Sequence, residues 1–141
     1  ALPRFRQGRA RIDLTFIDDA VQAVLSALSA QRALEGQAFN ISGGEVLPIL
    51  EIVESACGLA GIKPHWRAMP LTPALFAARM AETIALLRAE PREPVVTRYA
   101  LGLFAFEQSL DISRARVALG WTPQVRFADG LERVFDKGAI R

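Results

Sequence analysis

Two strand–loop–helix units follow each other in the first 62 residues of this 141-residue chain, and they constrain its fold more than any other feature. In Arg11–Asp18, apolar residues alternate with polar ones, which is the period of a strand with one buried face. Ala20–Ala30 then places its apolar residues on one helical face. Asp18 and Asp19 stand at the start of this helix, and we expect them to cap it, because unpaired N–H groups favour negative charge there. A general-acid role for the pair is the alternative. The pattern predicts an α/β protein.

The second unit carries a glycine pair where a phosphate-binding loop would lie. Gln37–Ser42 is predicted as a short strand, Gly43-Gly44 follows, and a helix then begins near Pro48 and ends by Gly61. A phosphate-binding loop needs a third glycine or the lysine of a P-loop, and neither is present. Glu45 would also repel a pyrophosphate. We therefore predict a structural turn at this position.

Five further elements are predicted in the second half, and one of them is apolar on nearly all sides. Thr72–Glu90 is predicted as a long helix with Thr72 as its cap. A helix with this composition is buried on most sides, or it contacts a hydrophobic ligand as a lid. The other predicted elements are a strand at Lys63–Met69 and helices at Val95–Phe106, at Ser113–Leu119 with Gly120 as its stop, and at Gly130–Lys137.

The chain is rich in apolar residues. They make up 51% of the sequence, and the mean hydropathy is +0.21, which argues against disorder. The excess predicts apolar surface that contacts a missing domain, a second subunit or a hydrophobic substrate, and we expect a homo-oligomer. The longest apolar stretch, residues 74–87, is interrupted by Arg79 and Glu82 and is too short to cross a bilayer, so we expect no transmembrane segment.

Single residues exclude several kinds of site. The sequence has one cysteine, Cys57, and one histidine, His65. An internal disulfide, a histidine-based metal cluster and a Ser-His-Asp triad are therefore excluded, and no metal site is expected. A lone cysteine fits a reducing compartment, and we expect a cytoplasmic protein.

Four arginines stand close together near the N-terminus: Arg4, Arg6, Arg9 and Arg11. They could face a phosphate or an acidic ligand, whereas a solvated loop is the simpler interpretation. The chain as a whole has 17 basic and 15 acidic residues and a net charge of only +2. Basic and aromatic residues do not alternate along a strand, so we expect no nucleic-acid binding.

Three motifs occur in order along the chain. They are Ile12-Asp-Leu-Thr-Phe-Ile-Asp-Asp-Ala-Val-Gln-Ala-Val24, Gly36-Gln-Ala-Phe-Asn-Ile-Ser-Gly-Gly-Glu45, and Asp111-Ile-Ser-Arg-Ala115 leading to Leu119-Gly-Trp-Thr-Pro123. The ordered set resembles the C-terminal half of an extended short-chain dehydrogenase/reductase of the NAD-dependent epimerase/dehydratase family. This resemblance covers nearly all of the chain. It implies the last strands of a Rossmann-type sheet in residues 1–62 and a small helical substrate lobe in residues 63–141.

The resemblance also implies that the catalytic machinery lies elsewhere. In that family the N-terminal half carries a glycine-rich dinucleotide loop and a Tyr-x-x-x-Lys pair, whose tyrosine exchanges a proton with the substrate as hydride moves to or from the nicotinamide. The single tyrosine here, Tyr99, is followed at the fourth position by Leu103, and no glycine-rich loop is present. We therefore expect a parent enzyme that binds NAD or NADP through an N-terminal domain absent from this chain. In the chain itself we expect no catalytic residue, no cofactor and no turnover.

The branch of the family is suggested by one position and one segment. Sugar-nucleotide epimerases and dehydratases often carry a diphosphate-binding arginine directly before the Asp-aromatic strand, and Ile12 occupies that position here. The Asp-Leu-Thr-Phe-Ile variant and the apolar helix resemble the branch that acts on 3β-hydroxysteroids, sterol carboxylates and long-chain 3-oxo acids. Burial of such a substrate against an apolar lid would supply about 25 cal/mol per Å² toward binding.

Four residues are candidates for substrate contact. Thr15 and Phe16 stand where the entering strand of the family faces the substrate cleft. Arg98 and Tyr99 are the polar exceptions on an otherwise apolar helix, and either could orient a carbonyl or a carboxylate. Strand packing for the first pair and a solvent-facing edge for the second are the structural alternatives.

Two other functions stay open. The chain could belong to a nucleotide-sugar epimerase or dehydratase, or to a non-catalytic module that senses a dinucleotide or binds another protein. A Tyr-x-x-x-Lys pair upstream of Ala1 would favour an enzyme over a sensor.

Overall fold

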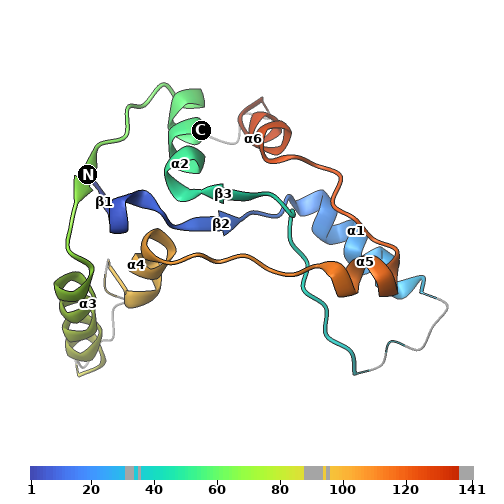
Figure 1. The fold of residues 1–141 in the computed structure, drawn as a ribbon, viewed down its shortest axis with the longest axis horizontal. Coiled ribbons are helices and arrows are strands. Elements are labelled where there is room, and N and C mark those ends of the chain that lie inside the picture. Colours follow the sequence, from blue (N-terminus) through green and yellow to red (C-terminus); the bar gives the residue numbers. More distant parts are fainter. Residues whose placement is uncertain (31–33, 35, 88–93, 95, 137–141) are drawn as a thin grey trace. The chain divides into compact units, whose positions relative to one another are not determined.

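The computed structural model describes residues 1–30, 34, 36–87, 94 and 96–136 (Figure 1). The chain forms two compact units, each built from two separate segments. The first unit contains Ala1–Ile12 and Pro48–Gln108, and the second contains Asp13–Leu47 and Ser109–Arg141. Each unit thus joins residues that are distant in sequence. The predicted assignment of residues 1–62 to a sheet remnant and 63–141 to a substrate lobe follows a different division and stays a prediction.

The first unit combines a short parallel sheet with helices. Strand β1 (Leu2–Arg4) pairs with β4 (Trp66–Ala68), and Leu2 lies opposite Trp66. A 3₁₀ turn, η1 (Arg6–Gly8), follows β1. The helices are α2 (Ile49–Leu59), α3 (Leu71–Leu86) and α4 (Arg98–Ala105), and α4 contacts α3, β1 and η1. The buried core consists of Phe5, Ala78, Leu101 and Ala105, with Leu71, Ala74, Leu75 and Phe104 packed against it.

The second unit is built around α1 (Ile17–Leu28), α5 (Ser113–Leu119) and α6 (Phe127–Asp136). Helix α1 contacts α5. The buried core consists of Ala23, Ile112, Ala115 and Trp121, and Phe39, Ile41 and Leu119 pack against it. Strand β2 (Arg11–Asp13) pairs with β3 (Val46–Pro48), and the division between the two units passes through both strands.

Most predicted helices are confirmed. Helices α1, α2 and α4 occur where the apolar periodicity placed them. Thr97 caps α4, because its Oγ1 accepts a hydrogen bond from the Ala100 N–H at 3.1 Å. Gly120 ends α5 in the left-handed conformation with φ of 63°, as predicted. Residues 88–90 of the predicted long helix, Val95 and Lys137 lie outside the described residues.

Three predicted boundaries are wrong. The strand predicted at Arg11–Asp18 ends at Asp13, because the chain turns and α1 already begins at Ile17. Thr72 does not cap α3, since the helix begins one residue earlier and Pro70 occupies its N-cap position. The last helix begins at Phe127, three residues before Gly130, because a side chain distant in sequence binds its first N–H group.

The strand predicted at Gln37–Ser42 does not form in the described part of the chain. A strand needs a hydrogen-bonded neighbour, and the sequence of an isolated segment does not supply one. Phe39 and Ile41, which alternate along this segment, nevertheless both pack against the core of the second unit.

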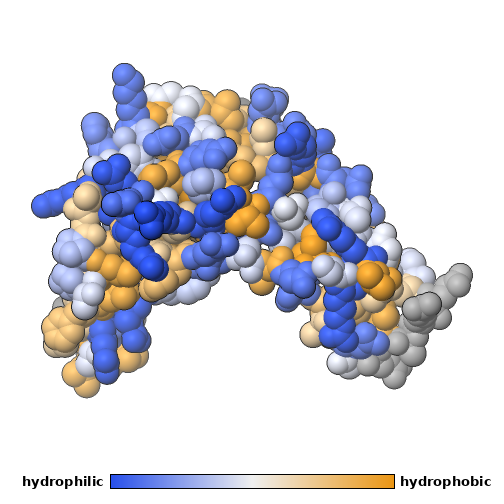
Figure 2. All heavy atoms as spheres, viewed as in Figure 1, coloured by the Kyte–Doolittle hydropathy of each residue, from blue (hydrophilic) through white to orange (hydrophobic). Residues whose placement is uncertain are grey.

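Helix α3 is largely exposed despite its apolar sequence. Ala78 is its one buried residue, whereas Phe76 is 66% exposed and Leu86 is 81% exposed. Figure 2 shows hydrophobic residues on the surface of this helix, at the lower left. Core packing therefore accounts for only one side of α3. Among the described residues, no helix is long and apolar enough to cross a membrane.

Candidate functional site

An open cavity of about 200 Å³ lies in the second unit, between the chain that leaves β2 and the first turns of α6. Its wall consists of residues 14–16, residues 125–127, and Gly130, Leu131 and Val134 of α6. We call it the apolar cavity. Complete small-molecule sites commonly have volumes of about 300–1,000 Å³. The apolar cavity therefore suits one portion of a ligand, such as an alkyl chain.

Thr15 and Phe16, both predicted to contact substrate, lie on the wall of the apolar cavity. Phe16 is the N-cap residue of α1, with extended backbone angles (φ −73°, ψ 143°). Its ring lies so close to α6 that a Cβ atom at Gly130 would be 2.8 Å from Phe16 Cδ2. The guanidinium of Arg133 lies 5.7 Å from the centroid of the same ring. Glycine at position 130 thus lets α6 approach the ring, while substrate contact by Thr15 and Phe16 stays a prediction.

The carboxylate of Asp19 fixes the segment that forms the second part of the wall. Asp19 is only 1% exposed, and its Oδ1 and Oδ2 accept hydrogen bonds from the backbone N–H groups of Gln124 at 2.8 Å and Val125 at 3.0 Å. Its backbone carbonyl oxygen accepts a third hydrogen bond, from Trp121 Nε1 at 3.1 Å. The predicted capping role of Asp19 is therefore wrong. A buried carboxylate is stable when N–H groups satisfy it, and here those groups come from the far end of the chain.

Helix α6 is capped from the glycine turn. Glu45 Oε2 accepts a hydrogen bond from the Phe127 N–H at 2.6 Å, and Glu45 Oε1 accepts one from Arg126 Nε at 3.3 Å. The hydrogen bond from the Phe127 N–H has the largest effect and lowers the pKa of Glu45 from its usual value. Burial opposes this shift to a smaller extent, and Arg126 lowers the pKa further. The residue expected to repel a phosphate thus has a structural role at the start of α6.

The glycine pair forms a turn held by Asp13. Asp13 Oδ2 accepts a hydrogen bond from Ser42 Oγ at 2.6 Å, and Oδ1 accepts one from the Gly44 N–H at 3.0 Å. A Cβ atom at Gly43 would lie 2.1 Å from the Leu14 carbonyl oxygen, so no side chain fits there. This arrangement agrees with the predicted structural turn. It also positions Leu14, the first residue of the cavity wall.

The lining of the apolar cavity is suited to binding rather than to proton transfer. Its polar groups are the hydroxyl of Thr15 and the guanidinium of Arg126, and the described residues of its wall include no carboxylate, histidine or cysteine. General acid–base catalysis at neutral pH commonly uses such groups. No cluster of three or more His, Cys, Asp and Glu residues suited to a metal ion occurs in the part of the chain that the structure describes.

Arg98 and Tyr99, the other two predicted substrate-binding residues, lie on α4 in the first unit. Arg98 donates to Glu82 twice, from its backbone N–H and from Nε, both at 2.7 Å. These bonds lower the pKa of Glu82. They join α4 to α3, so Arg98 has a structural partner. Tyr99 is 75% exposed. A substrate contact by either residue stays a prediction.

Seven wall residues were not among the predicted site residues: Leu14, Gly130, Val125, Arg126, Phe127, Leu131 and Val134. The sequence carries a signal for the last three, because Phe127, Leu131 and Val134 recur at helical spacing and share one face of α6. The periodicity shows that this face is apolar. It does not show that residues 14–16, more than 100 positions earlier, form the opposite wall.

The chain is similar to two curated proteins over most of its length. No family model matches it. It is 30% identical over 130 residues to the uncharacterized protein YbjS of Escherichia coli, and the matched region covers 89% of this chain and 37% of that protein. It is 30% identical over 142 residues to 2-alkyl-3-oxoalkanoate reductase of Stenotrophomonas maltophilia, and the matched region covers 93% of this chain and 43% of the reductase. The chain thus spans less than half the length of these relatives.

A solved structure has the same fold. UDP-glucuronic acid 4-epimerase from Bacillus cereus, in complex with UDP-glucuronic acid and NAD, matches with a TM-score of 0.60 and 24% identity, over 96% of this chain and 34% of the epimerase. The predicted fold class, an α/β portion of a Rossmann-type extended enzyme, is confirmed. Two of these similar proteins, a reductase and an epimerase, are of the NAD-dependent epimerase/dehydratase type, as the motifs predicted. The steroid-dehydrogenase branch stays a prediction.

Proposed function

We propose that this chain is the substrate-binding portion of an NAD(P)-dependent oxidoreductase that acts on the 3-oxo or 3-hydroxy group of a hydrophobic acid. The observation that carries the proposal is the apolar cavity, in a chain that resembles a 2-alkyl-3-oxoalkanoate reductase over 93% of its length. Among steroid-like and long-chain acids, we favour the long-chain 3-oxo acid because of this relative.

The cavity wall fits an alkyl group. Leu131 and Val134 of α6 and Phe16 present hydrocarbon to the interior, and Thr15 supplies a hydroxyl at the wall. Each Å² of alkyl surface transferred from water to such a wall contributes about 25 cal/mol to binding. Ile12, at the position where the sugar-nucleotide branches carry a diphosphate-binding arginine, supports a substrate without a diphosphate.

The cofactor and the proton-transfer residues are assigned to another part of the protein. This chain has no glycine-rich dinucleotide loop and no Tyr-x-x-x-Lys pair. We propose that an N-terminal domain of a cytoplasmic parent enzyme binds NAD or NADP, and that residues 1–62 complete its sheet while residues 63–141 contribute most of the substrate lobe. The isolated chain should then bind neither NADH nor NADPH at micromolar concentrations, and calorimetric binding of that strength would contradict the assignment.

The test uses the protein encoded by the complete reading frame that contains this chain. NADH and NADPH oxidation should be measured with a 2-alkyl-3-oxo acid of long chain length, with its short-chain analogue and with UDP-glucuronic acid. We expect turnover of the long-chain acid. Leu131→Phe, which narrows the apolar cavity, should raise the KM for the long-chain acid more than for the short-chain analogue. Val117→Phe is the matched control, because Val117 is 81% exposed on α5 and does not line the cavity.

A nucleotide-sugar epimerase or dehydratase is the second candidate, supported by the fold shared with the UDP-glucuronic acid 4-epimerase. Conversion of UDP-glucuronic acid without reduction of any 3-oxo acid would establish it in place of our proposal. Binding of a dinucleotide without turnover of any substrate would instead support the non-catalytic sensor.

A further inference from the structure

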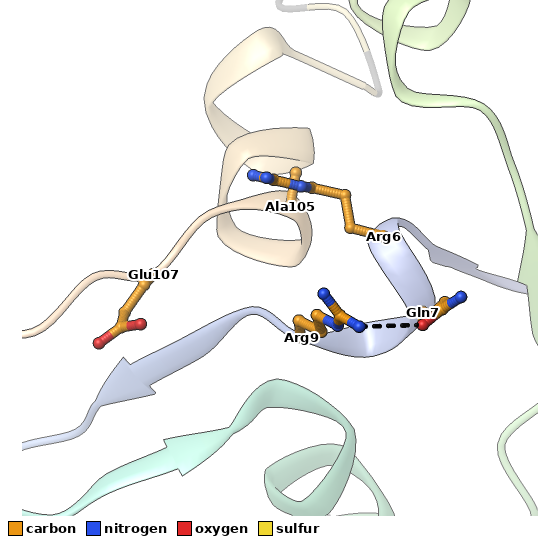
Figure 3. Close-up of a pocket in the computed structure, with 5 residues that line it drawn as sticks. All are labelled: Arg6, Gln7, Arg9, Ala105 and Glu107. Carbon is orange, nitrogen blue, oxygen red and sulfur yellow. Dashed lines mark hydrogen bonds between the residues drawn. The ribbon is translucent and has the colours of Figure 1, made fainter.

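A second cavity, of about 430 Å³, lies in the first unit and is lined by arginines. Arg6, Gln7 and Arg9 come from the turn after β1, Ala105 lies at the end of α4, and Glu107 lies just beyond it. Figure 3 shows Arg6 extending across the end of α4, with Arg9 on the turn below and Glu107 at the far side. We call this cavity the arginine pocket.

The turn that carries the two arginines has an unusual backbone. Arg6 has φ of 46°, Gln7 of 62° and Gly8 of 76°, so three consecutive residues are left-handed. Residues other than glycine seldom adopt this region, and they do so mainly where the surrounding structure holds them, often at binding sites. The Gly8 N–H closes the turn on the Phe5 carbonyl oxygen at 2.7 Å.

Buried residues on both sides determine where the arginines point. Phe5 is fully buried and Ala10 is 2% exposed, so the chain enters and leaves the core within six residues. Gly8 packs against α2 so tightly that a Cβ atom there would lie 2.2 Å from Leu50 Cδ1. The intervening side chains of Arg6 and Arg9 are consequently directed to the exposed side of the turn, where they line the pocket.

In the part of the first unit that the structure describes, the contacts of the two guanidinium groups are with uncharged groups. The Arg6 guanidinium lies over the ring of Phe106, 5.9 Å from its centroid, and Arg9 Nη2 donates to Gln7 Oε1 at 3.5 Å. Among the described residues, no carboxylate forms an ion pair with either arginine. An aromatic face and an amide orient a guanidinium but leave most of its N–H groups available to an anion.

The charge of the lining favours a monovalent anion. Two guanidinium groups and the carboxylate of Glu107 leave one net positive charge in the pocket. One carboxylate balances that charge, and its two oxygens match the fork of a guanidinium. A phosphate dianion would exceed the charge and would be repelled by Glu107.

We propose that Arg6 and Arg9 bind the carboxylate group of an organic acid in the arginine pocket. This binding involves residues of the first unit alone and is independent of the proposed function. Arg6 and Arg9 donate N–H groups to the carboxylate oxygens, Gln7 holds Arg9 in place, and Glu107 disfavours anions of higher charge.

Binding of hexanoate to the 141-residue chain tests this assignment, with hexanol and inorganic phosphate as comparison ligands. Hexanoate should shift the arginine Nε–H NMR signals of Arg6 and Arg9, and Arg6→Gln and Arg9→Gln should each weaken its binding by about tenfold. Arg67→Gln is the matched control, since Arg67 is exposed on β4 and does not line the pocket; it should change binding less than about twofold. Arg9→Lys should restore part of the affinity.

The variants keep the test decisive. Arg9 has right-handed backbone angles (φ −76°, ψ −7°), so Arg9→Gln removes the charge without touching the left-handed residues, and an unchanged amide spectrum verifies the fold. Three outcomes would each overturn the assignment. They are an equal loss of hexanoate affinity in Arg67→Gln and Arg9→Gln, an equal affinity for hexanol and hexanoate, and a tighter binding of phosphate than of hexanoate. Hexanoate binding needs no hydride transfer. If Arg9→Gln weakens hexanoate binding while the complete protein reduces no 3-oxo acid, only the proposed function fails. If 3-oxo acids are reduced but hexanoate binds Arg9→Gln as tightly as wild type, only the assignment of the arginine pocket fails.

Discussion

Asp19 accepts a hydrogen bond from the backbone N–H of Val125 across 106 positions of sequence. Asp19 lies in the first turn of α1, and Val125 lies on the wall of the apolar cavity. The same carboxylate accepts a second bond from the Gln124 N–H. The shape of the cavity therefore depends on a buried side chain that does not line it.

Asp19→Asn should destabilise the second unit by about 1–3 kcal/mol, because an amide offers one acceptor oxygen where the carboxylate offers two, and its NH₂ group would face a backbone N–H. Urea unfolding followed by Trp121 fluorescence measures the loss. Trp66→Phe provides the background, since it leaves Trp121 as the single tryptophan and Trp66 belongs to the first unit.

Asp18→Asn is the control for Asp19. It removes the same charge from the same helical turn, but Asp18 is exposed, and its ion pair with Arg133 is long, at 3.9 Å. Such pairs contribute about 0–1 kcal/mol. If Asp18→Asn destabilised the chain as much as Asp19→Asn, the loss would reflect helix charge rather than the bonds to residues 124 and 125.

The cap that Glu45 places on α6 should fail in acid. The Phe127 N–H lowers the pKa of Glu45 in the folded chain below its usual value of 4.5. A group whose pKa is lower in the folded state stabilises that state above its unfolded pKa, and the stabilisation is lost as the pH falls through the folded pKa. The difference in unfolding free energy between wild type and Glu45→Gln should be fully present at neutral pH, should shrink as the pH falls below 4.5, and should be lost once the pH is below the folded pKa. Carboxyl NMR titration gives that pKa directly, and a value at or above 4.5 would contradict the cap.

Local patterns in the sequence located the helices, although not all of their first residues, and were insufficient for the site. The spacing of Leu131 and Val134 predicts the last helix, although not its start at Phe127, and Gly120 predicts the end of α5, because both depend on residues close in sequence. The function of Asp19 could not be predicted in this way. Its position in a first helical turn suggests a cap, and its partners are more than 100 positions away.

The strand predicted at Gln37–Ser42 and the arginine turn illustrate the same limit. Phe39 and Ile41 alternate along the segment and both pack against the core, but strand pairing depends on a neighbouring strand that the segment does not contain. The clustering of arginines near the N-terminus is visible in the sequence. That Arg6 and Arg9 line one pocket follows from the left-handed backbone and from the burial of Phe5, and neither is a property of local spacing.

Gly130→Ala should alter the apolar cavity and destabilise the second unit by about 1–3 kcal/mol, as overpacking commonly does. The added Cβ would lie 2.8 Å from Phe16 Cδ2 and 3.4 Å from Val125 Cγ1, so the ring of Phe16 must move. Gly58→Ala is the matched control. Gly58 lies in α2, where a Cβ atom would have no described neighbour within 4 Å outside the backbone of its own helix, and the change should stabilise that helix by about 0.5–1 kcal/mol. Stabilisation by Gly130→Ala would show that the ring is not packed against α6.

The exposed face of α1 should make the chain self-associate. Val24 is 60% exposed and Leu28 is 79% exposed one turn later, so a continuous apolar stripe faces solvent while Ala23 faces the core. Sedimentation equilibrium should therefore give a mass above that of the monomer, and Val24→Glu should shift it toward the monomer, because a charge cannot be buried in an apolar contact at low cost. Gln22→Glu adds the same charge at another exposed position of α1 and should leave the mass unchanged. A chain that is monomeric at every concentration, or that responds equally to both substitutions, would contradict an interface on this face and would leave a covering domain of the parent enzyme as the partner of α1.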